Sequence, residues 1–321
     1  MSADGSALTF AVLGRRFAAR QVSLRLAEWL RAGWDFPELS APSHPFAIDL
    51  DVVASAPAGA RDDWARLEVV VPGRTIRFRS DGRCWETGDE AAGLRMELRG
   101  DGAAIELWGS ERQADPVALH HGLYVALSEA LRSSGLVPLH AAVAAPDDAA
   151  VAWLGASGIG KSTTLLHAVE TGWRPVAEDL CWLEPATLRV YGWDRGVRCW
   201  PDTLERFFPL LRGAEPAPDG KRIIRYDRLG ASSPRTGTLA RLALLVRASE
   251  GPSRWEAATA RDLVRSLWEA TGVPLSDRSR EVTADAVVRL SRLPVSKLVL
   301  GNTPPPLGGS AEGWSDQAGV G

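Results

Sequence analysis

The sequence has little of what marks secreted or nucleic-acid-binding proteins. Its 321 residues include only three cysteines, Cys84, Cys181 and Cys199. Because their number is odd and their spacing is not that of a zinc site or a disulfide framework, we expect reduced thiols. The net charge of -3 leaves no positive surplus for nucleic acid or an anionic membrane surface. We therefore expect no nucleic-acid partner, but a small molecule or a protein.

Long apolar runs are also missing. No uncharged apolar run approaches the length that a bilayer-spanning helix needs, and "MSADGSALTF" at the start lacks the basic segment and apolar core of a signal peptide. We therefore expect a cytoplasmic protein that does not associate with membranes. The composition is otherwise average, with 45% hydrophobic and 24% charged residues, which argues against wholesale disorder.

Two regions with different patterns can be distinguished. Residues 20–33 carry apolar residues at helical spacing, whereas 46–109 consist of short alternating segments separated by turns. These patterns predict an N-terminal domain over 1–115, with a small, mainly antiparallel sheet and helices. We expect a second domain over 116–300, and a disordered tail over 301–321, because that tail is rich in Pro, Gly and Ser.

The second region alternates strands and helices. The apolar strands "LVPLHAAVAA" and "AAVAWLG" lead into a glycine-rich loop, a helix from about 161 to 171, and the strand "RPVAED". Strand, loop, helix and strand in this order form one α/β unit with the glycine loop at its head. We therefore expect an α/β fold class.

The glycine-rich loop fits the phosphate-binding pattern G-x-x-x-x-G-K-[ST]. Its residues are Gly155, Ala156, Ser157, Gly158, Ile159, Gly160, Lys161, Ser162 and Thr163. In such loops, backbone N–H groups and the helix N-terminus surround the phosphates, the lysine (here Lys161) neutralises β/γ charge, and the hydroxyl (Ser162) reaches Mg²⁺. The pattern predicts a nucleotide site. The alternative is a tight strand-to-helix turn with a coincidental lysine.

Two adjacent carboxylates, Glu178 and Asp179, follow the next strand. They should emerge at the same sheet edge as the glycine loop, where ligands bind in open α/β sheets. One can hold a metal while the other accepts a proton from an attacking hydroxyl. We take Ser162 and Asp179 as the first candidates for metal ligands, but which carboxylate is the base stays open. The alternative is a solvated acidic loop.

Further candidates are one histidine and four cations. His140 lies near the start of the strand pair that leads into the loop, and, taken alone, it could be an ordinary core histidine. The cations that could neutralise a transferred phosphoryl group are Arg195, Arg198, Lys221 and Arg222. They could equally solvate a loop or pair with the acidic residues Asp194, Asp202 and Glu205.

These residues resemble the catalytic domain of HPr kinase/phosphorylase, a bacterial protein-serine kinase that carries a P-loop. The resemblance covers about residues 136–185 and rests on "LHAAV", "GASGIGKST", a helix closing in "TGW", and "RPVAED". It implies a P-loop kinase core of the type shared with phosphoenolpyruvate carboxykinase. It also implies that Lys161 and Ser162 serve ATP and Mg²⁺, that the 178/179 pair supplies metal ligand and base, and that His140 lies near the transferred phosphoryl group.

The layout "PLHAAV...GASGIGKST...PVAEDL...WPD...GKR" is also similar to HPr-kinase-like proteins of bacterial peptide-biosynthesis clusters, including lasso-peptide kinases. This similarity implies an ATP-dependent serine kinase for a peptide or protein, with a ribosomally made, lasso-type precursor peptide as the first candidate. A homo-oligomer is a further expectation. Two alternatives stay open: a nucleotide-binding regulatory ATPase module and a small-molecule hydroxyl kinase. The first alternative is motivated by Glu178, which stands where the HPr kinase family has an aspartate.

Overall fold

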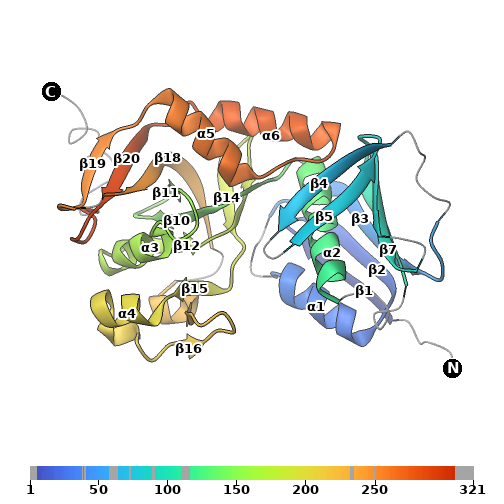
Figure 1. Ribbon diagram of the computed structural model, residues 1–321, viewed down its shortest axis with the longest axis horizontal. Helices are drawn as coiled ribbons and strands as arrows, with labels where there is room; N and C mark the ends of the chain where they lie inside the picture. Colours follow the sequence, from blue (N-terminus) through green and yellow to red (C-terminus); the bar gives the residue numbers. More distant parts are fainter. Residues whose placement is uncertain are drawn as a thin grey trace. The chain divides into compact units, whose positions relative to one another are not determined.

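The computed structural model describes residues 6–37, 39, 41–57, 64–71, 74–88, 91–109, 116–231, 235–248 and 250–307. Within these ranges the protein is mixed α/β, with three sheets and six α-helices (Figure 1). None of the helices described there has the length and apolar character to cross a membrane. The chain divides into two compact units: Met1–Leu136 with Val273–Thr283, and Val137–Gly272 with Ala284–Gly321. The boundary expected from the sequence, at residue 115, lies before the observed one, at Leu136.

The first unit is built on an eight-stranded sheet with the order β1-β2-β3-β8-β7-β6-β5-β4. Its strands are β1 (Ser6–Val12), β2 (Arg15–Val22), β3 (His44–Val53), β4 (Ala65–Val71), β5 (Arg74–Ser80), β6 (Cys84–Gly88), β7 (Gly93–Arg99) and β8 (Gly102–Trp108). Neighbouring strands are antiparallel except β2–β3 and β3–β8, which are parallel. The sheet is therefore mainly antiparallel, as expected, but it is not small.

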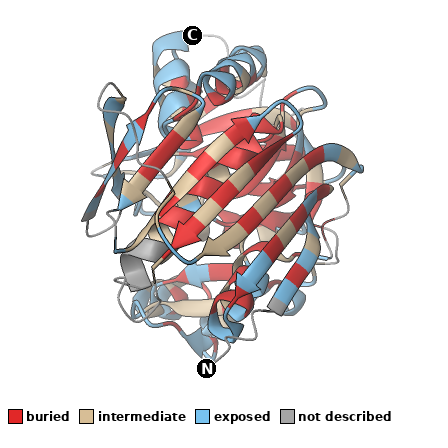
Figure 2. Ribbon diagram, turned by 90° about the vertical axis from the view of Figure 1, so that its right-hand side faces the viewer, coloured by how far each residue is buried: buried red, intermediate tan, exposed pale blue. Residues whose placement is uncertain are grey.

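The core of the first unit lies on one face of this sheet. Ile48 and Leu50 in β3 and Leu94 and Met96 in β7 are at most 1% exposed, whereas the residues between them are partly exposed (Figure 2). Such alternation follows from the two-residue period of a strand. The helices of this unit are α1 (Leu24–Trp34) and α2 (Pro116–Ser133). Contacts of α2 with β7 and β8 place it on the sheet.

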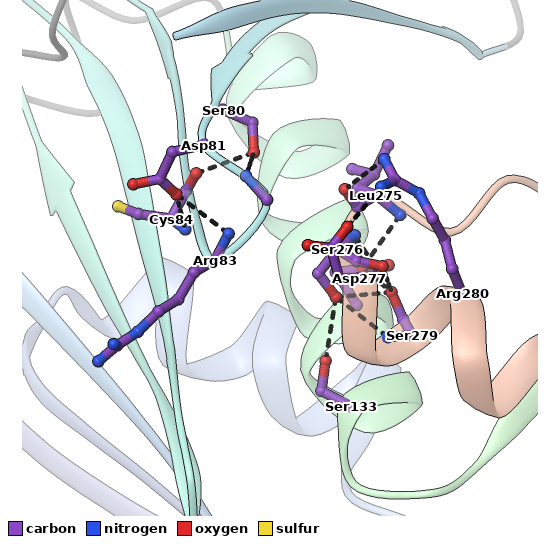
Figure 3. Close-up of polar contacts among 12 residues, drawn as sticks. Ser80, Asp81, Arg83, Cys84, Ser133, Leu275, Ser276, Asp277, Ser279 and Arg280 are labelled. Atoms are coloured by element: carbon purple, nitrogen blue, oxygen red, sulfur yellow. Dashed lines mark hydrogen bonds and ion pairs between the residues drawn. The ribbon is translucent and has the colours of Figure 1, made fainter.

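The chain returns to the first unit through residues 273–283, which contain the start of α6 (Asp277–Leu290). The hydroxyls of Ser276 and Ser279 lie 2.7 Å apart at this helix N-terminus, next to Ser133 of α2 (Figure 3). The buried carboxylate of Glu129 accepts hydrogen bonds from the backbone N–H groups of Leu275 (3.0 Å) and Ser276 (2.7 Å). Negative charge is favourable at a helix N-terminus, so Glu129 anchors α6 on α2.

The second unit contains a nine-stranded sheet. Seven of its strands follow the order β12-β10-β11-β18-β14-β13-β9, while β20 pairs with β18 and β19 with β20. The strands are β9 (Val137–Leu139), β10 (Ala141–Ala145), β11 (Ala149–Leu154), β12 (Arg174–Ala177), β13 (Cys181–Glu184), β14 (Arg189–Gly192), β18 (Thr236–Arg247), β19 (Arg254–Ala257) and β20 (Val295–Leu300). In Figure 1, α3 (Lys161–Glu170) lies on one face and α5 (Ala260–Thr271) on the other.

Burial on both faces explains the composition of the central strands. All five residues of β10 and all but the first of β11 are buried. Strands that helices cover on both faces are apolar throughout and do not alternate between apolar and polar residues. The sequences of β10 and β11, AAVAA and AAVAWL, are apolar throughout. The glycine loop therefore starts from a rigid, fully covered strand.

A three-stranded sheet completes the second unit. It has the order β15-β17-β16, with β15 (Gly196–Cys199), β16 (Glu215–Pro216) and β17 (Arg222–Arg225). The helix α4 (Pro201–Phe207) and two 3₁₀ turns, Pro209–Leu211 and Tyr226–Leu229, belong to the same segment. Val197 and Ile224 of this sheet share a buried cluster with Leu165 and Leu166 of α3, so the small sheet is fixed beside the glycine loop.

Residues 301–307, which the composition had assigned to a disordered tail, are packed. The backbone N–H of Ser253 donates to the Thr303 hydroxyl (2.9 Å), and Trp255 Nε1 donates to the Pro306 carbonyl (3.1 Å). Leu307 is 1% exposed. The three prolines before Leu307 lose little backbone entropy when they are ordered. One buried leucine and these hydrogen bonds are therefore enough to hold residues 301–307 in place. The remainder of the expected tail, 308–321, lies outside the described residues.

Candidate functional site

The strand directions bring the two predicted motifs to one edge of the sheet. β11 is antiparallel to β10, and β10 is antiparallel to β12, so β11 and β12 run in the same direction. The glycine loop follows β11, while Glu178 and Asp179 follow β12. Both segments therefore leave the sheet at the ends of similarly directed strands, where ligands bind in α/β proteins.

The backbone of the glycine loop needs its glycines. Gly158 and Gly160 have φ angles of 77° and 124°, which L side chains rarely adopt. A Cβ on Gly160 would also lie 2.8 Å from Leu300 Cδ1. Gly160, the N-cap of α3, has no side chain that could cap the helix, and the N–H groups of a first helical turn can bind an anion in place of a cap. The loop thus fits a phosphate chain.

Lys161 is folded over the loop and is only 5% exposed. Its Nζ atom donates to the carbonyl oxygens of Gly155 (2.9 Å) and Ala156 (3.4 Å), and lies 2.9 Å from Nε2 of His140. Burial lowers the pKa of the Lys161 ammonium, although the neighbouring carboxylates oppose this effect. The Lys161 ammonium group therefore lies within the glycine loop, where it could pair with the negative charge of a phosphate.

Ser162 donates a hydrogen bond to Oε1 of Glu178, which is 5% exposed. Burial, with a smaller contribution from the charge of Asp179, raises the pKa of Glu178 to about 7 against the opposing hydrogen bond from Ser162. We had paired Ser162 with Asp179 as metal ligands; the structure instead brings Ser162 to Glu178.

A hydroxyl and a carboxylate oxygen side by side are donors that Mg²⁺ prefers, and Mg²⁺ usually takes one or two carboxylates with phosphate and water. Ser162 and Glu178 therefore fit this ion. The described ranges hold no cluster of three or more His, Cys, Asp or Glu side chains that could bind a metal, so an ion at this site would need phosphate and water as further ligands.

Asp179 faces His140 instead. Oδ1 of Asp179 lies 3.4 Å from Nδ1 of His140, and the two side chains are 54% and 39% exposed. Burial lowers the pKa of His140, the charge of Asp179 opposes this, and Lys161 reinforces it. Because Lys161 donates to Nε2, the neutral ring carries its proton on Nδ1, toward Asp179. His140 thus links Lys161 to Asp179 and is no isolated core histidine.

Asp194 is a residue of the site that sequence reasoning missed. Its Oδ2 accepts hydrogen bonds from the backbone N–H groups of Glu178 (2.7 Å) and Asp179 (2.8 Å), while its Oδ1 accepts from the Tyr226 hydroxyl and from Arg235 (3.2 Å). Burial raises the pKa of Asp194, and the Tyr226 and Arg235 contacts oppose this. Asp194 therefore fixes the turn that carries both carboxylates. We had considered it only as a partner for loop cations, because no motif surrounds it.

Two of the four predicted cations, Arg198 and Arg222, contact residues other than those described above. Arg198 pairs with Asp219 at 2.7 Å, and Arg222 reaches the Ala214 carbonyl at 3.5 Å. Arg195 is exposed. The partner of Arg198 is therefore Asp219 and none of the three acidic residues that the sequence suggested, Asp194, Asp202 and Glu205.

Lys221 differs from the other three. Its charge lowers the pKa of Lys161 and of Glu178, in each case as a smaller effect than burial. Its Nζ atom also lies 5.5 Å from the centre of the Trp200 ring. Lys221 is thus the predicted cation whose field reaches the glycine loop.

Two pockets border the glycine loop at its opposite ends. The first, the α4-side pocket, has a volume of about 450 Å³, and its lining includes Gly160, Thr163, Arg206, Arg247, Asn302 and Thr303. The second, the α5-side pocket, has a volume of about 220 Å³ and is lined by His140, Gly155, Ala156, Ser157, Ser266, Glu269 and Ala270. Sequence reasoning missed lining residues such as Arg247, Asn302, Ser266 and Glu269, because they lie far from the loop along the chain.

In comparisons with known proteins, no protein-family model and no curated protein matches the chain. The structure brings Lys161, His140 and Asp179 into one set of contacts and Ser162 and Glu178 into another.

Proposed function

We propose that the protein is an ATP-dependent kinase that phosphorylates a serine hydroxyl of a peptide or protein. The proposal rests on one observation: the two carboxylates beside the glycine loop contact different partners. Glu178 pairs with the Ser162 hydroxyl, whereas Asp179 faces the histidine that contacts Lys161. A metal-ligand pair and an acid–base pair beside a phosphate loop are the groups that phosphoryl transfer to an alcohol needs.

The resemblance of "GASGIGKST" and "RPVAED" to HPr kinase/phosphorylase supports the same class. It supports a P-loop kinase core of the type shared with phosphoenolpyruvate carboxykinase. Within that class, a ribosomally made precursor peptide remains our first candidate for the acceptor.

The chain's own residues would divide the binding of ATP. Backbone N–H groups of the loop and of the first turn of α3 bind the phosphates, and Lys161 turns from its carbonyl partners to the β/γ oxygens. Ser162 and Glu178 would hold Mg²⁺, which would neutralise phosphate charge when bound. The α4-side pocket, at the end of the loop away from Lys161's contacts, receives the nucleoside.

The acid–base pair would act on the acceptor. The acceptor oxygen forms a bond to the γ-phosphorus while the bond to the β,γ-bridging oxygen breaks, and ADP leaves. When Lys161 turns to the phosphates, Nε2 of the neutral His140 is free to take the acceptor proton. Asp179 then faces the Nδ1–H and stabilises the charged ring, as a carboxylate does for a catalytic histidine.

A direct test incubates the full chain with Mg²⁺, ATP and a pool of peptides that carry one serine among varied neighbours. We expect phosphopeptides by mass spectrometry, and their loss in Lys161→Ala with the circular dichroism spectrum unchanged. Normal ATP binding with every peptide unlabelled would refute the kinase proposal.

A second candidate is a regulatory ATPase module that transfers phosphate only to water. It is favoured by the three partners of Lys161, which must be exchanged when phosphates bind and could couple nucleotide to conformation. Release of phosphate together with a conformational change, but without phosphopeptide, distinguishes it from the kinase.

A further inference from the structure

The α5-side pocket lies between the start of the glycine loop and one face of α5. Ser266, Glu269 and Ala270 form its helical wall, because residues three and four positions apart share a face. The backbone N–H of His140 donates to the Ala270 carbonyl at 2.8 Å. This bond fixes the histidine against the end of α5, so the pocket is a defined part of the second unit.

The contacts of Lys161 identify which end of the phosphate chain this pocket borders. In phosphate loops the lysine reaches the β- and γ-phosphates. The partners of Lys161, namely Gly155, Ala156 and His140, all line the α5-side pocket. The α4-side pocket instead begins at Gly160 and Thr163. The α5-side pocket is therefore at the γ-phosphate end.

The size and lining of the pocket suit a small alcohol. A volume of about 220 Å³ corresponds to roughly seven water molecules, which is enough for one short side chain and too little for a drug-sized ligand. Oε1 of Glu269 accepts a hydrogen bond from Arg265 at 2.8 Å, and Ser266 and Glu269 both line the pocket from the same face of α5, so a carboxylate and a hydroxyl border it. Neither Glu178 nor Asp179 lines the pocket, whereas His140 does.

We propose that the α5-side pocket binds the acceptor, a serine side chain on an extended peptide segment, and that Ser266 and Glu269 hydrogen-bond this segment. The inference rests on the proposed kinase function and adds the place where the acceptor enters. The acceptor oxygen then lies between His140 and the γ-phosphorus. The new P–O bond forms as the β,γ-bridging bond breaks, the proton passes to His140 Nε2, and ADP is the leaving group. The Glu269 carboxylate disfavours acidic residues beside the serine.

The test fills the pocket without touching the phosphate loop. Ser266→Leu places a larger side chain in the cavity on a helix that tolerates leucine, and Arg261→Leu makes the same final change at an exposed position of α5 outside the lining. Both variants and the wild type are assayed with Mg²⁺-ATP and the single-serine peptide pool. The Kd for ATP is measured in parallel. Glu269→Gln removes the charge at nearly constant shape.

We expect Ser266→Leu to lower kcat/KM for the peptides by about tenfold or more, while the Kd for ATP and the Arg261→Leu variant stay close to wild type. Glu269→Gln should raise KM for peptides more than it lowers kcat, and should increase labelling of peptides with acidic neighbours. Equal transfer by Ser266→Leu and Arg261→Leu overturns the acceptor pocket alone. ATP binding without labelling of any peptide by the wild type overturns the kinase proposal, and the acceptor role of the pocket with it.

Discussion

Nζ of Lys161 lies 2.9 Å from Nε2 of His140 and 2.9 Å from the carbonyl oxygen of Gly155. The cation is thus held by neutral acceptors at the start of the glycine loop. Phosphate oxygens carry formal negative charge and form stronger, charge-assisted hydrogen bonds with an ammonium group. ATP is therefore expected to draw Lys161 away from both partners.

Replacing this lysine tests the phosphate site. Lys161→Met keeps the length of the buried stem and removes the charge, so we expect the affinity for ATP to fall by about tenfold or more. The melting temperature should not fall, because burial already disfavours the charged form. Isothermal titration calorimetry measures the affinity, with Lys297→Met as the control, since Lys297 pairs with Asp262 (3.6 Å) outside the loop. Equal ATP affinity in the two variants would contradict the site.

Glu178 makes the stability of the metal-free protein depend on pH. Its pKa is raised from 4.5 to about 7 in the folded state. The folded state therefore binds this proton more tightly than the unfolded state, and stability falls as pH rises through about 4.5 to 7, by on the order of 3 kcal/mol. Glu178→Gln cannot ionise and should lack this loss. Urea unfolding in EDTA at about pH 5 and about pH 8 measures the difference; parallel changes in wild type and variant would exclude the effect.

We expect Asp194 to affect the proposed reaction through the turn that it holds. Asp194→Ala leaves two backbone N–H groups and Arg235 without their carboxylate, so we expect a loss of about 3 to 5 kcal/mol in unfolding free energy. Because the carboxylates at 178 and 179 lose their positions, kcat should fall in the folded fraction more than KM for ATP rises. Tyr226→Phe removes a single hydroxyl donor and should cost only about 1 kcal/mol. A variant with wild-type kcat would show that the turn needs no such anchor.

The glycine-rich loop, with a buried strand before it and a helix after it, could be predicted from the sequence because its signal is local. Its glycines, Lys161 and Ser162 are contiguous, and an apolar strand and a helical pattern flank them. The assignment of Ser162 to Glu178 could not be predicted, since it depends on how far a side chain reaches once β12 is placed. Asp194 and the α5 residues lie still farther along the chain. Only the tertiary fold brings them to the loop.

The first strands were missed for a different reason. We predicted a helix over 20–33, but β2 continues to Val22, and α1 begins at Leu24 after the capping residue Ser23. Apolar residues at 22, 24 and 26 fit both a strand and a helix at their junction, so periodicity does not locate the boundary. The turn between β1 and β2 uses Leu13 and Gly14 with φ angles of 48° and 79°. Leucine is rare in that conformation, so a turn at this position is hard to predict from the residue types.

The α4-side pocket should contribute to ATP binding and not to chemistry. Arg247 and Asn302 line it at the end of the loop opposite the partners of Lys161. Arg247→Ala should therefore raise KM for ATP several-fold, by about 1 kcal/mol of binding, and leave kcat unchanged, which is the signature of uniform binding. Arg261→Ala, at an exposed position of α5, is the matched control. A fall in kcat at constant KM would place Arg247 near the reacting groups instead.

Glu129 should matter for stability and not for the site. Its buried carboxylate accepts from two backbone N–H groups and from the Ser279 hydroxyl at the start of α6. Glu129→Ala leaves these donors unsatisfied in a buried region, so the unfolding free energy should fall by about 2 to 4 kcal/mol. Ser279→Ala removes one donor and should cost about 1 kcal/mol. Glu281→Ala, at an exposed position of the same helix, serves as the control.

Urea unfolding measures the stability of all three variants. The Kd for ATP of each folded variant should remain near wild type, because Glu129 belongs to the first unit and the glycine loop to the second. A weaker ATP affinity in Glu129→Ala at full folding would reveal that the anchoring of α6 extends its influence to the nucleotide site.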